Sequence, residues 1–135
     1  MKFPEEDLDK KVVDLIFEAA EECLYAPESI NLENKIVLSI AIRLNAEKFM
    51  IELINDDDFV KGISSNQTWE LLQKFEEIYN NEKKVLEVVK RVNLITPENI
   101  HINSFMYEPI IDMGDGELKK LYEETKKLKE YMIIR

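Results

Sequence analysis

Cysteine and turn-forming residues are scarce in this chain of 135 residues. Three glycines and four prolines are too few for the many turns that a β-sandwich of this size requires. Cys23 is the single cysteine, which excludes an intramolecular disulfide and a zinc site built from several cysteines, and is typical of a reducing compartment. The sequence therefore predicts an all-α protein with a few long helices, located in the cytoplasm.

The sequence motifs of common enzyme families are also missing. There is no glycine-rich phosphate loop, no G-x-S-x-G and no H-E-x-x-H, and His101 is the only histidine. Cys23 falls on an apolar stripe, where a buried thiol is usually unreactive. We therefore predict no catalytic residue, no metal site and no cofactor, and the sequence favours a protein that is not an enzyme.

Long hydrophobic runs free of charge are absent as well. The most apolar stretch, residues 36–54, contains Arg43, Glu47 and two further charged side chains, which are costly inside a bilayer. The first residues are acidic, whereas a signal peptide begins with basic residues. Neither a membrane span nor a signal peptide is expected.

Acidic residues predominate, and they are concentrated in the first half of the chain. The net charge is −10, and residues 1–60 carry 15 acids and 6 bases, whereas residues 61–135 carry 13 acids and 12 bases. Direct binding to nucleic acid is disfavoured, because such proteins present basic surface to the phosphates. The acidic half either faces a basic partner or only keeps the protein soluble.

Apolar residues recur at helical spacing through most of the chain. Helices are expected at about 4–25, 32–55, 67–93 and 117–133. The first helix has one apolar stripe, formed by Leu8, Val12, Leu15, Ile16, Ala19 and Cys23. The stretch 32–55 is apolar on nearly all sides, which predicts a central helix surrounded by the others.

Local signals predict where several of these helices begin and end. Ser29 or Asn31 is expected to cap the second helix, and the pair Asn80-Asn81 favours a break in the third. Thr96-Pro97 resembles a helix start. The expected architecture is one domain over residues 1–135, a compact bundle of four to five helices around the helix at about 32–55, with an irregular segment at about 96–116.

Arg43 is the most unusual polar residue, because it lies in the middle of the apolar helix. A guanidinium there must find partners or reach solvent. Glu47, one turn later, satisfies it in a structural interpretation. In a functional interpretation, Arg43 and Glu47 bind a small ligand with the help of other acids such as Asp112.

Three large side chains are candidates for contact with another protein. Trp69 follows a polar turn and belongs either to the core or to an interface. Phe105 and Tyr107 lie in the irregular segment, which is rich in large apolar residues. We expect an exposed apolar patch near Phe105–Tyr107 if this segment contacts a partner.

The sequence supports three functional hypotheses in decreasing order. The first is a protein-interaction or regulatory accessory domain, with a protein partner or self-association. The second is a helical protein that binds or hydrolyses a small ligand through Arg43 and nearby carboxylates. The third is an acidic inhibitor of a basic or nucleic-acid-binding partner.

Overall fold

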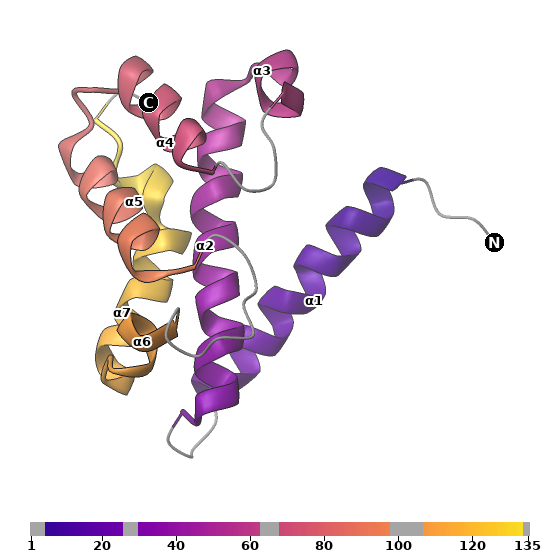
Figure 1. The fold of residues 1–135 in the computed structure, drawn as a ribbon, viewed down its shortest axis with the longest axis vertical. Coiled ribbons are helices and arrows are strands. Elements are labelled where there is room, and N and C mark those ends of the chain that lie inside the picture. The colour runs from indigo at the N-terminus through magenta and orange to yellow at the C-terminus, as the bar shows by residue number, and fades with distance from the viewer. Residues whose placement is uncertain (1–4, 26–29, 63–67, 98–106, 134–135) are drawn as a thin grey trace.

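A computed structural model of the protein describes residues 5–25, 30–62, 68–97 and 107–133. Every regular element within these ranges is a helix, as the sequence predicts. The elements are α1 (Glu5–Tyr25), α2 (Leu32–Ile54), α3 (Asp57–Gly62), α4 (Thr68–Ile78), α5 (Lys83–Ile95), α6 (Glu108–Ile111), α7 (Asp115–Lys126) and the 3-10 helix η2 (Leu128–Tyr131). Figure 1 shows α4, α5 and α7 on one side of α2, and α1 on the other.

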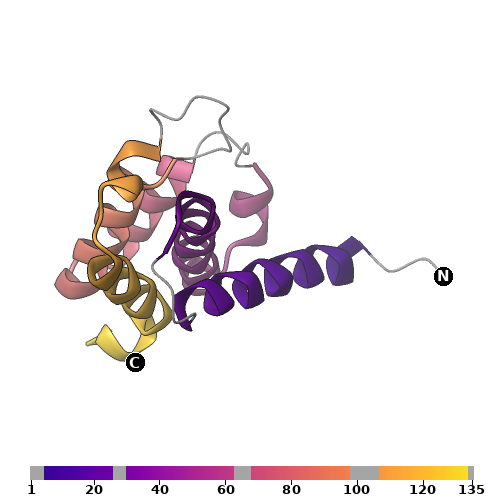
Figure 2. The same ribbon diagram turned by 90° about the horizontal axis from the view of Figure 1, so that it is seen from below.

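The predicted central helix is confirmed as α2. It contacts α1, α4, α5, α6, α7 and η2, and Figure 2 shows it nearly end-on with other helices around it. Leu38, Ala41 and Ile42 on this helix are completely buried. Because neighbours cover α2 on several sides, its apolar residues do not need to be confined to one stripe.

Asparagines mark both ends of α2. The Oδ1 atom of Asn31 accepts a hydrogen bond of 2.9 Å from the backbone N–H of Asn34, so Asn31, one of the two caps that the sequence allows, caps α2. The other candidate, Ser29, lies outside the described residues. At the other end, Asn55 adopts φ 49° in the left-handed region. Asparagine tolerates this conformation better than most residues, and α2 stops there.

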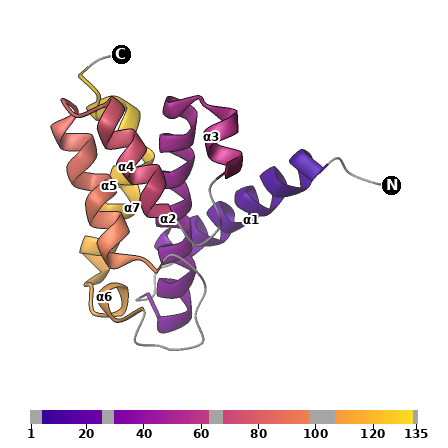
Figure 3. The ribbon, with the colours of Figure 1, turned by 45° about the horizontal axis from the view of Figure 1, so that its top comes forward.

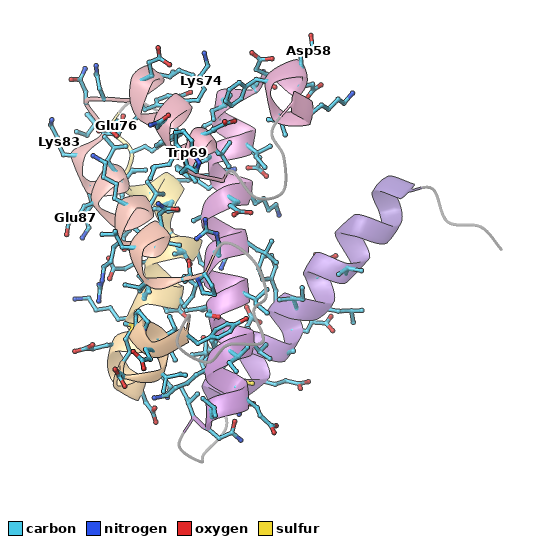
Figure 4. The ribbon with its side chains drawn as sticks, in the orientation of Figure 1. Asp58, Trp69, Lys74, Glu76, Lys83 and Glu87 are labelled. Carbon is cyan, nitrogen blue, oxygen red and sulfur yellow. The ribbon has the colours of Figure 1, made fainter. Side chains whose placement is uncertain are left out.

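The acidic run that follows α2 begins a new helix. Asp56 accepts a hydrogen bond of 3.1 Å from the backbone N–H of Phe59, and Asp57 and Asp58 form the first turn of α3. Figure 4 shows Asp58 at the outer end of α3. Asp57 and Asp58 therefore lie near the positive end of the dipole of α3.

The predicted break at Asn80-Asn81 is also confirmed. α4 ends at Ile78 and α5 begins at Lys83. The turn between them contains a backbone hydrogen bond of 3.1 Å from Glu82 to Tyr79. The aromatic rings of Phe75 and Tyr79 are 5.0 Å apart, and Phe75 is completely buried.

One helix prediction near the C-terminus needs correction, and another is not tested. Thr96 ends α5, where its backbone N–H bonds to the carbonyl of Val92, and a helix that starts after Pro97 would lie outside the described residues. The last helix, expected at 117–133, is divided into α7 and η2 at Lys127. Residues 98–106, in the predicted irregular segment, lie outside the described residues.

Polar contacts connect the start of α2 to the segment around α6. The Nζ atom of Lys35 donates hydrogen bonds to the carbonyls of Ile111 (2.8 Å) and Met113 (2.9 Å). The backbone N–H of Ile30 donates to Asp115 at 3.2 Å. These bonds satisfy backbone groups at the ends of short helices and fix α6 and α7 against the N-terminal end of α2.

Helix α1 differs from the rest of the bundle in its position. Its C-terminal half lies against α2, whereas its N-terminal half diverges from α2 and projects from the bundle (Figures 1 and 3). Ala20 and Leu24 are buried, and Ile16 and Phe17 are partly buried against the core. Helix α1 therefore packs against the bundle through one edge of its C-terminal half.

Candidate interaction surface

Arg43 is buried and its hydrogen bonds join α2 to the end of α5. Its Nε atom donates to Glu47 at 3.0 Å. Its Nη1 atom donates to the backbone carbonyl and the hydroxyl of Thr96 at 3.0 and 3.2 Å, and its Nη2 atom donates to Asn93 at 3.1 Å. These contacts match the structural interpretation of Arg43, in which partners inside the fold satisfy the guanidinium.

The cavity beside Arg43 is too small for a substrate. Its volume is about 10 Å³, and Arg43, Glu47 and Asn93 line it together with apolar side chains. Such a volume holds about one water molecule, whereas sites for small ligands usually measure several hundred Å³. The geometry around Arg43 and Glu47 therefore gives no support to the ligand-binding hypothesis.

The three predicted contact residues have different surroundings. Trp69, at the start of α4 (Figure 4), is 43% exposed and available to a partner. Tyr107 is only 3% exposed and belongs to the hydrophobic core. Phe105 lies outside the described residues. Because Tyr107 is buried, it does not form part of the exposed apolar patch that we expected near Phe105–Tyr107.

A surface that the sequence did not predict as a contact site lies along α1. Val12 and Leu15 are 48% and 55% exposed, and Ala19 and Cys23 are partly exposed one and two turns further on. Their spacing of three and four residues places these four side chains on one flank of the helix. This flank is called the α1 stripe below.

The α1 stripe was visible in the sequence, but its exposure was not. The apolar residues that recur along the first helix were all expected to face the core. In the structure, Ala20 and Leu24, which lie beside the stripe, are buried in the core. Val12 and Leu15 remain at the surface. A helix with a wide apolar arc buries only the part that its neighbours reach.

Acidic side chains border the α1 stripe. Glu18 and Glu22 are exposed, and they lie three and seven residues after Leu15, on the same side of the helix. Residues 5–25 contain eight acidic residues and two lysines, which gives this segment a net charge of −6. This surface is therefore both apolar and strongly negative.

The opposite edge of α1 is held to α7 by polar contacts. Lys126 donates a hydrogen bond of 2.8 Å to Glu21, which lowers the pKa of Glu21 and raises the pKa of Lys126. The hydroxyl of Tyr122 lies 3.5 Å from the same carboxylate. Burial, with a further contribution from Glu21, raises the pKa of Tyr122 to about 12.

A groove opens between α1 and the C-terminal helices. Its volume is about 350 Å³, and residues of α1, α2, α7 and η2 line it. The charged residues that line it are Lys48, Lys126, Lys129 and Glu52. It is called the lysine groove below.

The lysine groove was not predicted because its residues are far apart in the sequence. Lys48 and Lys129 are 81 positions apart, and no local pattern signals that they meet. Lys129 is 3.3 Å from Glu52 in an exposed ion pair, whereas Lys48 is exposed and makes no ion pair with the residues that the structure describes. Lys126 is likewise paired with Glu21, so Lys48 supplies the positive charge of the groove that no described residue pairs.

The thiol of Cys23 is poorly suited to nucleophilic chemistry. Burial raises its pKa, and the negative charge of Glu22 raises it further. Because the thiolate is the reactive form, this environment keeps Cys23 in its less reactive state. Its position on the α1 stripe gives it a role in packing.

Fold and surface together define a small all-α protein built around one central helix. Comparison with protein-family models, with curated proteins and with solved structures finds no match to this chain. In the part of the chain that the structure describes, no helix is both long and apolar enough to cross a membrane.

Proposed function

We propose that this chain is a protein-interaction domain that contacts its partner through the α1 stripe. The observation that carries this proposal is the exposure of Val12 and Leu15 on the half of α1 that projects from the bundle. Covering these side chains would remove apolar surface from water, which is the main favourable contribution to most protein association.

Other exposed apolar residues give weaker support to a contact surface. Single exposed hydrophobic side chains are common in monomeric proteins, and Leu94 on α5 is an example, at 80% exposed. Val12 and Leu15 differ because Ala19 and Cys23 continue their row along the same flank of α1. A continuous row offers a partner several adjacent contacts, as in the docking of an amphipathic helix.

The test is affinity capture from the source lysate with three forms of the tagged protein: wild type, Leu15→Glu and Leu94→Glu. A glutamate at position 15 places a charge in the middle of the stripe, and we expect it to abolish capture of a specific partner. An untagged copy of the same chain counts as a partner in this test.

Leu94→Glu is the matched control, because it makes the same change at an exposed leucine outside α1. We expect it to capture the same partner as the wild type, and circular dichroism should show the same helix content for all three proteins. If Leu15→Glu retains every protein that the other two capture, the α1 stripe is not the contact surface.

A further inference from the structure

We infer that the α1 stripe of one molecule docks on the lysine groove of a second copy, an inference that rests on the proposed function of α1 and names its partner. Two surfaces of the same chain have complementary chemistry. One is an acidic helix flank with exposed apolar residues, and the other is a groove that lysines and apolar side chains line together.

The groove has apolar side chains for the stripe to contact. Phe17 on α1 lines it and is partly exposed. Phe49 on α2 and Leu128 on η2 also line it but are only 6% and 0% exposed, so Phe17 is the accessible apolar side chain. Docking of Val12 and Leu15 there would shield apolar groups on both molecules from water. A helix flank placed in a groove between helices is a recurrent mode of recognition.

The charges of the two surfaces are opposite. The groove is lined by three lysines and one glutamate, and two of the lysines, Lys126 and Lys129, already form exposed ion pairs within the chain. Glu18 and Glu22 border the stripe. Lys48 is available to an incoming carboxylate, because it makes no ion pair with the described residues. Lys129 would exchange an exposed ion pair with Glu52 for a contact with the second copy, at little cost in free energy.

A contact between two α1 helices fits the charges less well. Two copies of residues 5–25, each with a balance of −6, would lie side by side, and like charges in contact oppose association. In the stripe–groove contact, two different surfaces meet. Such association ends at a dimer when the two contacts are reciprocal, and otherwise continues to larger species.

The experiment is sedimentation velocity over a range of concentrations with the purified chain and two variants. Leu15→Glu places a charge in the stripe and is called the stripe variant. The double variant Lys48→Glu/Lys129→Glu reverses two charges of the groove and is called the groove variant. The changed side chains are exposed, so folding should be preserved. We expect the wild type to associate reversibly and each variant to associate at least about tenfold more weakly.

A mixture of the two variants tests the pairing of the surfaces. The groove variant keeps its stripe and the stripe variant keeps its groove, so one intact contact can form between them. We expect the mixture to form a one-to-one dimer that neither variant forms alone. A contact between two stripes would not be restored in this mixture.

Lys83→Glu on α5 is the charge control, because Lys83 points away from α2 (Figure 4) and does not line the groove. The Lys83→Glu variant should associate as strongly as the wild type. A wild-type chain that remains monomeric, or a mixture that remains monomeric while the wild type associates, overturns the stripe–groove contact. Loss of a different partner by Leu15→Glu in the capture experiment would still support the proposed function, so the two failures are distinguishable.

Discussion

The bundle around α2 and the projecting helix α1 use apolar residues in different ways. In the bundle, neighbours cover α2 on several sides, and Phe75 of α4 is completely buried. On α1, Ala20 and Leu24 are buried while Leu15 remains exposed. The comparison shows that an apolar helix residue contributes to folding only where another element reaches it.

The largest expected effect is in the bundle. Phe75→Ala should lower the free energy of unfolding by about 3–5 kcal/mol, because it removes a buried ring that lies 5.7 Å from the ring of Phe49 and leaves a cavity. Chemical denaturation measures this change. Ile78→Ala, at an exposed position of the same helix, should cost less than about 1 kcal/mol; equal losses would mean that Phe75 is not a core residue.

A comparison within α1 should give the next largest difference. Leu24→Ala should cost about 2–4 kcal/mol, because Leu24 is 1% exposed. Leu15→Ala is the same chemical change at an exposed position and should alter stability by at most about 0.5 kcal/mol. Urea denaturation of both variants measures the difference, and a large loss in Leu15→Ala would show that the stripe is needed for folding.

A smaller effect is expected for Arg43, which joins α2 to α5 through polar contacts. Arg43→Ala should destabilise the protein by about 1–3 kcal/mol, because buried partners such as the carbonyl of Thr96 lose a charged donor. Thermal denaturation checks this prediction. Arg91→Ala, at an exposed position of α5, is the control and should change stability by at most about 0.5 kcal/mol.

The smallest effect is expected for the exposed ion pair that joins α1 to α7. A double-mutant cycle with Glu21→Gln and Lys126→Met should give a coupling energy of at most about 0.5 kcal/mol near neutral pH, because solvent screens the pair. A coupling above about 1 kcal/mol would show that this pair holds α1 to the bundle more strongly than an exposed pair normally does.

The coupling energy between Glu21 and Lys126 should depend on pH in a defined direction. The pKa of Glu21 is lowered from 4.5, so its stabilisation is present above pH 4.5 and is lost as the pH falls through the lowered value. The pKa of Lys126 is raised from 10.5, so its stabilisation is present below pH 10.5 and is lost above it. A coupling that grew on acidification would contradict this assignment.

The candidate site was less predictable than the fold. Arg43 and Glu47 were recognised because they are one turn apart in an apolar helix, but the partners of Arg43 at Asn93 and Thr96 are 50 and 53 residues away. Tyr107 was expected at the surface because an irregular segment gives no periodic signal of its burial. The lysine groove brings together residues from four elements, and it exists only after the helices pack.

The sequence alone determined an all-α chain and the central helix α2, limited the cap of α2 to Ser29 or Asn31, and favoured a break at Asn80-Asn81. These features depend on residues within about one or two helical turns of each other, where spacing and backbone preference act directly. Tertiary structure decided which part of the α1 apolar arc is buried, where Arg43 finds its partners and how the lysine groove forms. Those outcomes depend on contacts between distant segments, whose positions are fixed only by the packing of the whole bundle.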